Sequence, residues 1–307
     1  MALPRSLAPR RGEKLASDLN AKRNLVGWGF LIPAAALIAV MSFYPMIKAL
    51  IISLTRRGST AAFADPLWAN YKRLLSDEVF VLTLKNTFLY LVIQVPIMLI
   101  LALILAVILN DRSLRFKGLW RTAIFLPCAV SLVSYSLVFR TLFANDGLVN
   151  TVLKACGFIS DNINWLGQPD TARFVIILGL IWRWTGYNMV FYLAGLQNID
   201  YSSLEAAKID GAGPIRTFFS VILPQLKPMI LLTAIMSTNG TLQLFDESWN
   251  LTRGGPAYST MTMSHYIYNL SFMNNPNFAY ASAISYIILI LVAVLALLQM
   301  KVGDKRD

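Results

Sequence analysis

The residues best suited to bind a solute lie inside an apolar stretch. The run Ser237-Thr238-Asn239-Gly240-Thr241-Leu242-Gln243-Leu244 brings hydroxyl and amide groups into it. On a helix Ser237, Gly240, Thr241 and Leu244 share one stripe, and Asn239 and Gln243 lie on a neighbouring stripe. Hydroxyl and amide groups can hydrogen-bond a polyhydroxylated solute such as a sugar. Polar groups inside a membrane normally face a bundle interior or a wet cavity, where such a solute could reach them. Helix–helix packing through small hydroxyl residues is the alternative.

A second polar cluster interrupts another apolar stretch at a matching depth. It consists of Thr185, Gly186, Tyr187, Asn188 and Met189, and either Tyr187 or Trp184 could stack on a sugar ring. Arg183 lies near the middle of the same stretch. We expect it to pair with Asp246 or Glu247, because a charge inside a membrane needs a partner. The alternative is that Arg183 meets an anionic solute such as a sugar phosphate or uronate.

The composition indicates that these stretches are embedded in lipid. The 307 residues are 56% hydrophobic and only 14% charged, with a mean hydropathy of +0.58, whereas soluble domains carry about 25% charged residues. The net charge of +11 does not predict nucleic-acid binding, because the basic residues lie between apolar blocks. A single histidine and two distant cysteines leave no basis for a metal site, a His-based triad or a disulfide framework.

Six stretches are long and apolar enough to span a membrane, which takes about 20 residues each. They are Leu25–Leu54, Thr83–Leu109, Thr122–Phe143, Arg173–Leu196, Leu226–Trp249 and Ala279–Met300. The expected fold is therefore all-α and integral to the membrane, with both termini on one side. With those termini inside, the inner segments hold fifteen Lys and Arg and the outer loops six. This bias predicts cytoplasmic termini, although Arg56 and Arg57 run against it.

One inner connection, residues 201–224, has the features of a helix–turn–helix. Ser202 and Glu205 match a capping box that would start a short helix. Gly211 and Gly213 would end it, and Pro214 suits the first turn of a second helix, which Pro224 and Pro228 would break. From these features alone, a simple loop between two spans is an equally good interpretation.

A resemblance favours a specific role for this segment. Three groups of residues at this spacing resemble the EAA loop of ABC importer permeases: Glu205-Ala206-Ala207, Asp210-Gly211-Ala212 and Ile222-Leu223-Pro224. In that family the loop places a coupling helix in a cleft of the ATPase subunit. The resemblance implies that Glu205 pairs with a basic group there and that Gly211 allows close approach. It implies that the residues in contact with the ATPase are Glu205, Ala206, Ala207, Asp210, Gly211, Ala212 and Pro224.

The resemblance covers nearly the whole chain. Several short segments are similar to segments of carbohydrate-uptake permeases. They are Asn70-Tyr71, Asn86-Thr87, Phe125-Leu126-Pro127, Trp165-Leu166 and Trp184-Thr185-Gly186-Tyr187. Leu251-Thr252-Arg253-Gly254-Gly255-Pro256 is similar to one subunit type of the maltose and glycerol-3-phosphate systems. The family implies a type I importer permease fold, a sugar or oligosaccharide as solute, and a pathway lined by the stretch before Gly254. It also implies a bacterial or archaeal inner-membrane location.

The sequence lacks a G-x-x-x-x-G-K-[ST] phosphate loop, so we expect no ATP hydrolysis and no bound cofactor in this chain. The resemblance implies two separate ATPase subunits holding ATP and Mg²⁺, a second homologous permease and an extracytoplasmic solute-binding protein. We divide the chain into a cytoplasmic segment (1–24), a permease domain (25–300) and a tail (301–307). The alternatives are a permease for a sugar phosphate, uronate or amino acid, or an ion-coupled secondary transporter.

Overall fold

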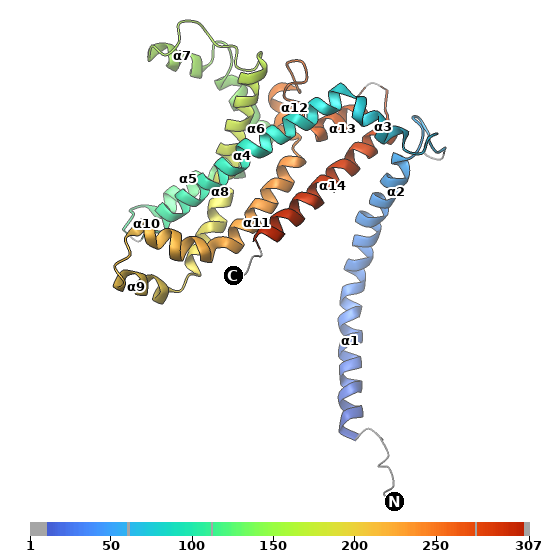
Figure 1. The fold of residues 1–307 in the computed structure, drawn as a ribbon, viewed down its shortest axis with the longest axis vertical. Helices are drawn as coiled ribbons and strands as arrows, with labels where there is room; N and C mark the ends of the chain where they lie inside the picture. The colour runs from blue at the N-terminus through green and yellow to red at the C-terminus, as the bar shows by residue number, and fades with distance from the viewer. Residues whose placement is uncertain (1–10, 60–61, 112, 274, 304–307) are drawn as a thin grey trace, which may run out of the picture.

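The computed structural model describes residues 11–59, 62–111, 113–273 and 275–303, which are helical apart from turns and one isolated bridge between Thr55 and Phe63 (Figure 1). Within these ranges five helical stretches are long and apolar enough to cross a membrane, and a bent pair makes a sixth. The expected all-α, six-span architecture is confirmed. The predicted terminal segments fall partly outside the described residues, as do their cations Arg5, Arg10, Lys305 and Arg306, and the loop cation Arg112.

The six spans are α1 (Arg11–Ile38) with a π-helical turn η1 (Ala39–Phe43) and α2 (Tyr44–Ser53); α4 (Glu78–Asn110); α5 (Lys117–Ala129) with α6 (Leu132–Leu142); α8 (Pro169–Gln197); α10 (Pro214–Thr217), η2 (Phe218–Ile222) and α11 (Leu223–Leu242); and α14 (Phe278–Gly303). The helices between them are α3 (Ala69–Ser76), α7 (Leu148–Ala155), α9 (Tyr201–Ile209), α12 (Asp246–Thr252) and α13 (Met263–Phe272). In Figure 1, α9 and α10 lie at one end of the bundle and α3, α12 and α13 at the other.

Spans α4, α8, α11 and α14 form the body of the bundle. Small residues such as Ala102 and Ala106 on α4 are fully buried where α4 packs beside α8, together with Met189 and Tyr192. The Tyr192 hydroxyl meets the Thr233 hydroxyl of α11 at 2.8 Å. Small residues let helix backbones approach closely inside a membrane, so this side of the bundle is tightly fixed.

Span α1 departs from this arrangement. It projects away from the other helices in Figure 1, and none of the residues in its apolar window is buried, whereas half of those in α8 are. Only its last part, α2, packs on α14. The first span therefore offers its apolar surface to something other than this chain.

The third span is broken, which the sequence did not predict. We expected one helix over Thr122–Phe143, but α5 and α6 meet at 96°. The backbone is extended at Val130 (φ −73°, ψ 142°) and at Ser131 (φ −54°, ψ 136°). Such backbone cannot continue the helical ladder, so the last carbonyls of α5 need donors from elsewhere.

The fifth span also differs from its predicted range, Leu226–Trp249. It is helical from Pro214 and ends at Leu242, and Trp249 lies in the separate helix α12. Pro224 falls in the first turn of α11, after the η2 turn, and Pro228 is accommodated within α11. The prediction that these prolines break the helix is wrong, because the helical path continues through both: Pro224 follows directly on the π-helical turn η2, and Pro228 lies inside α11.

The segment 201–224 has the predicted two helices but a different cap. Asp200, not Ser202, caps α9, since its carboxylate accepts hydrogen bonds from the Ser202 N–H at 3.1 Å and the Ser202 hydroxyl at 2.7 Å. These bonds lower the pKa of Asp200. Gly211 ends α9 at φ +73°, where the Ala212 N–H reaches the Ala207 carbonyl at 2.9 Å, and Pro214 begins α10.

Asp77 joins three elements at the opposite end of the bundle. Its Oδ1 caps α4 by accepting the N–H groups of Val79 and Phe80. Its Oδ2 accepts the hydroxyls of Tyr266 at 2.8 Å and Tyr280 at 2.6 Å, from α13 and α14. Burial raises the pKa of Asp77, but these bonds, from Tyr280 first, outweigh it and hold that pKa below its usual value. The carboxylate therefore anchors α13 over the helix ends.

Candidate functional site

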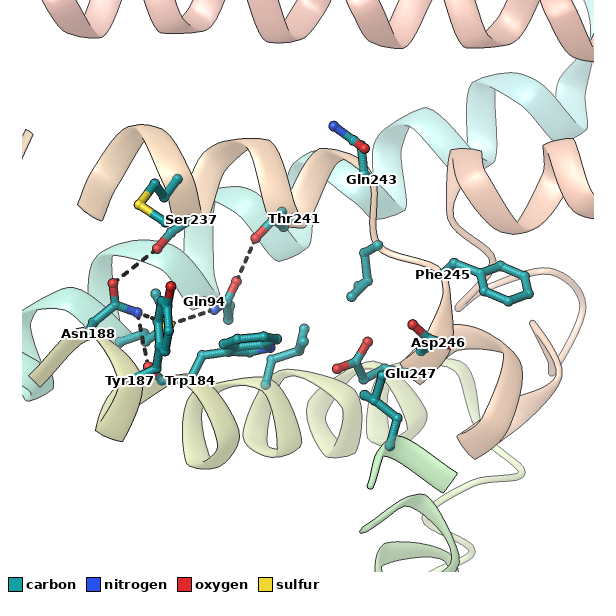
Figure 2. Close-up of a pocket in the computed structure, with 16 residues that line it drawn as sticks. Gln94, Trp184, Tyr187, Asn188, Ser237, Thr241, Gln243, Phe245, Asp246 and Glu247 are labelled. Carbon is teal, nitrogen blue, oxygen red and sulfur yellow. Dashed lines mark hydrogen bonds between the residues drawn. The ribbon is translucent and has the colours of Figure 1, made fainter. Parts of the chain in front are cut away.

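A cavity of about 290 Å³ opens between α4, α8 and α11 and is bounded by α6 and the start of α12. Figure 2 shows side chains from all three spans converging on it. Its 16 lining residues are Gln94, Met98, Leu132, Leu180, Trp184, Tyr187, Asn188, Met236, Ser237, Gly240, Thr241, Gln243, Leu244, Phe245, Asp246 and Glu247. A mostly apolar wall with a few converging polar groups is the usual character of a ligand site.

The stripe predicted on the fifth span faces this cavity. Ser237, Gly240, Thr241 and Leu244 all line it. Asn239 does not: it is exposed, and its Oδ1 accepts a hydrogen bond from Gln243. Gln243 lies at the rim, where its amide points away from the polar cluster in Figure 2. A helix presents one face to a cavity, so the neighbouring stripe is turned away.

Only part of the predicted α8 cluster reaches the cavity. Tyr187 and Asn188 line it, as does Trp184. Thr185 bonds to the Ile181 carbonyl at 2.6 Å, and Met189 is fully buried in the α4–α11 core. Gly186 lies against α5, where an added Cβ would be 2.0 Å from the Ile124 carbonyl oxygen. Thr185, Gly186 and Met189 therefore face neighbouring helices and not this cavity.

Hydrogen bonds connect the polar groups of the three spans across the cavity. The Thr241 hydroxyl donates to Gln94 Oε1 at 3.1 Å, and Gln94 Nε2 points to Met98 Sδ at 3.1 Å. Asn188 Nδ2 donates to the Trp184 carbonyl at 3.0 Å, which leaves its Oδ1 for the Ser237 hydroxyl at 3.5 Å. The network fixes the amides and keeps hydroxyl groups at the surface.

Aromatic rings complete one wall. Trp184 and Tyr187 pack edge to face with centroids 5.7 Å apart. Sugar rings present apolar C–H faces that pack well on such rings, while their hydroxyl groups need amide, hydroxyl or carboxylate partners. The cavity offers both kinds of surface side by side.

Sequence reasoning missed several lining residues. Gln94 and Met98 come from α4, which contributed no candidate, although a glutamine within the long apolar run of that span was a usable signal. Asp246 and Glu247 were considered only as partners for Arg183. Their place on the wall depends on the break after Leu242, which turns α12 back toward α8.

Arg183 does not pair with either carboxylate. Its guanidinium donates to carbonyl oxygens of α5 and the break that follows: NH1 to Val130 at 2.9 Å and Pro127 at 3.4 Å, and NH2 to Cys128 at 3.3 Å. It also lies over the rings of Tyr135 and Trp184. The prediction that Arg183 pairs with Asp246 or Glu247 is wrong, since the broken span supplies the acceptors.

In the described ranges the single ion pair is Arg173–Asp170, at 3.2 Å.

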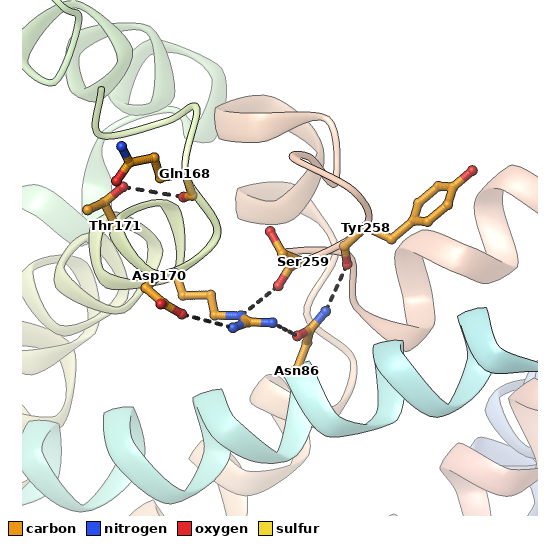
Figure 3. A network of polar contacts seen from close by, with 7 residues as sticks. Asn86, Gln168, Asp170, Thr171, Tyr258 and Ser259 are labelled. Atoms are coloured by element: carbon orange, nitrogen blue, oxygen red, sulfur yellow. Dashed lines mark hydrogen bonds and ion pairs between the residues drawn. The ribbon is translucent and has the colours of Figure 1, made fainter. Parts of the chain in front are cut away.

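A second polar network holds the loop between α12 and α13 against α4 and α8 (Figure 3). Asn86 of α4 donates through Nδ2 to the carbonyls of Tyr258 at 2.9 Å and Met261 at 3.0 Å. Arg173 of α8 donates to Asn86 Oδ1 at 3.2 Å and to the Ser259 carbonyl at 2.9 Å. The turn that follows Gly254-Gly255-Pro256 is thereby tied to both spans.

A buried histidine fixes α12 on α13. His265 Nδ1 lies 2.7 Å from the Ser248 hydroxyl, which also contacts the Thr260 carbonyl at 2.8 Å. Phe245 and Trp249 stack on each other and pack edge-on against the imidazole. Burial, aided by Arg253, lowers the pKa of His265 to about 4, so the ring is neutral at pH 7.

Comparison with known proteins identifies the family. The model for binding-protein-dependent transport system inner membrane components matches residues 80–304, which is most of the chain. The chain belongs to this family. It is a multi-pass membrane protein, and its relatives are transport permease subunits.

Among them, a lactose transport system permease protein of Rhizobium radiobacter is 51% identical over 94% of this chain and 98% of its own length. An arabinooligosaccharides transport system permease protein of Halalkalibacterium halodurans is 30% identical over 95% of this chain and 91% of its own.

A solved structure confirms the fold. One chain of a bacterial ABC transporter involved in import of the acidic polysaccharide alginate matches with a TM-score of 0.82, over 96% of this chain and 99% of that chain, at 22% identity. A second structure of the alginate transporter, in complex with a pentasaccharide-bound periplasmic protein, also gives 0.82 and covers 93% and 96%. The expected type I importer permease fold is therefore confirmed.

Proposed function

We propose that this chain is a permease subunit of an ATP-driven importer and that the cavity between α4, α8 and α11 is where a sugar or short oligosaccharide passes. The convergence of Gln94, Asn188, Ser237 and Thr241 beside Trp184 carries the proposal. The names of the relatives, which are lactose and arabinooligosaccharide permeases, support the solute class.

The segment α9–α10 supports coupling to separate ATPase subunits, which would hold ATP and Mg²⁺. Glu205 is exposed and has no ion pair within the described residues, so its carboxylate is free for a basic partner. Ile209, Ile215 and Phe219 are also exposed at 86%, 76% and 61%. Closure of the ATPase subunits would push this segment as a lever and rock intact helices about the cavity, since lipid-embedded helices cannot expose their backbone.

The same reasoning extends to the other partners. The unburied span α1 supports a second permease subunit, because another membrane protein packed along it would complete the pathway. The complex of the alginate transporter with a periplasmic protein supports an extracytoplasmic solute-binding protein. Loaded binding protein would deliver the sugar on the side of α12 and α13, opposite α9.

Purification of the full complex through a tag on this chain, followed by reconstitution with ATP inside the vesicles, tests the proposal. Uptake of radiolabelled lactose should require ATP, and Ser237→Val should weaken it severalfold without changing assembly. Lactose uptake by this chain with no ATPase subunit present would refute the proposal.

A matched pair tests the coupling step. Gly211→Asn keeps the left-handed backbone accessible, because asparagine tolerates positive φ, but it adds a side chain to the proposed contact surface. Gly213→Ala adds a methyl at an extended position with no neighbour within 4 Å. ATP hydrolysis should continue in Gly211→Asn with sugar uptake reduced at least about tenfold, and Gly213→Ala should resemble wild type. Equal uptake in the two variants would contradict a docking role for Gly211.

A further inference from the structure

The cavity has a charge bias that the fold does not dictate. Among the residues that the structure describes, Asp246 and Glu247 are the only formally charged ones that line it, and no lysine, arginine or histidine does so. The alginate transporter of the same fold is involved in the import of an acidic polysaccharide, so the fold is compatible with anionic cargo. In this chain the charge of the solute must be decided by the side chains of the cavity.

Glu247 is the more confined of the two acids. The residue is only 3% exposed, and its carboxylate points from α12 into the cavity toward Trp184 (Figure 2). Burying an ionised carboxylate is costly unless it is paired or hydrogen-bonded. The surrounding groups therefore determine what Glu247 can do.

No neighbouring side chain satisfies this carboxylate. Its own backbone N–H is the one hydrogen-bond donor that acts on it, and no cation lies within ion-pair distance among the described residues. Arg183 of α8 is the cation whose charge reaches it, but the N–H groups of that guanidinium are used by the α5 carbonyls. Tyr135 of α6 is close enough to interact electrostatically with Glu247, but its hydroxyl donates no hydrogen bond to the carboxylate.

The absence of these partners leaves lone pairs of Glu247 directed at the space a solute would fill. A sugar hydroxyl is the matching donor, and hydrogen bonds to an ionised acceptor are about twice as strong as neutral ones. A carboxylate, sulfate or phosphate on the solute would instead face a second negative charge in a poorly hydrated space. Within the described ranges no cation lines the cavity to neutralise that charge.

We infer that Glu247 selects for uncharged sugars, by accepting hydrogen bonds from their hydroxyl groups and by repelling sugars that carry an acidic group. The inference rests on the proposed function, that this cavity is where the solute passes. At an effective dielectric constant of about 20, two like charges about 5 Å apart predict discrimination of at least tenfold.

The ionisation of Glu247 adds a pH signature. α12 lies beyond the end of the fifth span, and burial, together with Asp246, raises the pKa of Glu247 to about 7, while Arg183 opposes the rise. The side chain gains charge between pH 6 and pH 8. Rejection of an acidic sugar, whose own carboxylate stays ionised throughout, should therefore strengthen as the pH rises.

Equilibrium dialysis on the purified complex without its binding protein tests the inference, because the binding protein could filter solutes first. The probes are radiolabelled lactose and the disaccharide in which galacturonate replaces its galactose. Wild type should bind lactose at least about tenfold more tightly than the uronate at pH 8, with a smaller ratio at pH 6. In Glu247→Gln the ratio should fall below about threefold through tighter uronate binding, with no pH dependence.

Two further variants make the result decisive. Glu247→Met also removes the charge but offers no acceptor, so it should lose the rejection and also bind lactose less tightly than Glu247→Gln. Glu78→Gln, an exposed glutamate of α4 outside the cavity, should retain the wild-type ratio. Retained lactose binding with an unchanged ratio in both Glu247 variants would overturn the inference alone. Failure of wild type to bind either probe would overturn the proposed function with it.

Discussion

The guanidinium of Arg183 lies 2.9 Å from the carbonyl oxygen of Val130 and so holds the break between α5 and α6 against α8. Two more carbonyls of α5, those of Pro127 and Cys128, share the same guanidinium. A charged donor inside the bundle thereby replaces the helical N–H groups that the bend takes away. The cation that sequence reasoning assigned to a carboxylate or a solute is part of the scaffold.

Arg183→Met should destabilise the protein by about 2–4 kcal/mol, because it leaves buried carbonyls unpaired. Lysine at this position should recover part of the loss, since its ammonium group has fewer donors in a different geometry. Thermal unfolding of the purified complex measures both effects, with the exposed Arg140→Met as control. A change in the preference between lactose and its uronate analogue, without loss of stability, would instead indicate that Arg183 contacts solute.

Gly186 and Gly240, both predicted from the sequence to lie at the solute site, should respond differently to substitution by alanine. At Gly186 the new methyl would lie 2.0 Å from a backbone oxygen of α5, so α8 and α5 must separate, at a cost of about 3 kcal/mol or more. At Gly240 nothing lies within 4 Å, and the methyl would enter the cavity. Gly240→Ala should fold normally and raise the KM for sugar severalfold.

The measurement is thermal stability and uptake on the same preparations. Both effects come from one added methyl on a membrane helix, so each variant serves as the control of the other. Normal stability of Gly186→Ala would show that the α5–α8 contact relaxes easily.

The parts of the fold that sequence predicted are those set by local chemistry. Six apolar blocks gave the spans, and the glycines and Pro214 gave the turn between α9 and α10. The stripe from Ser237 to Leu244 was predicted to share a face because its spacing matches one turn of a helix.

The features missed depend on contacts between distant segments. The break at Val130 is stabilised by Arg183, which lies 53 residues further along the chain. The end of α11 at Leu242 was hidden because the apolar residues Leu244, Phe245 and Trp249 follow it closely and are typical of a span that continues. The side of α8 that faces the cavity depends on its rotation against α5, so composition could not separate Asn188 from Gly186.

Asn86 should be important for the stability of the turn beyond Pro256. Asn86→Ala removes the donor to the Tyr258 and Met261 carbonyls and an acceptor of Arg173, which predicts a loss of about 1–3 kcal/mol. Hydrogen exchange over residues 254–262 should rise in this variant. Asp170→Asn is the control: its carboxylate is 96% exposed, and such pairs contribute about 0–1 kcal/mol. Similar exchange in both variants would contradict the role given to Asn86.

His265 should give the stability a pH dependence of known sign. Its folded pKa is about 4, below the ordinary 6.5, because the ring is buried and lies near Arg253. Above pH 6.5 the ring is neutral in both the folded and unfolded states and has no effect. Between pH 6.5 and pH 4 only the unfolded chain gains the proton, so the native state loses about 1.4 kcal/mol per pH unit.

His265→Gln should remove this dependence, since a glutamine amide can still contact Ser248 and does not titrate. The informative quantity is the difference in melting temperature between wild type and variant at pH 7.5, 6.5 and 5.5. Glu247 acts in the opposite direction, because its raised pKa lets the native state bind a proton first as the pH falls, but it is common to both proteins and cancels. The wild type should lose stability relative to His265→Gln as the pH falls; parallel curves would mean that the imidazole is protonated in the fold.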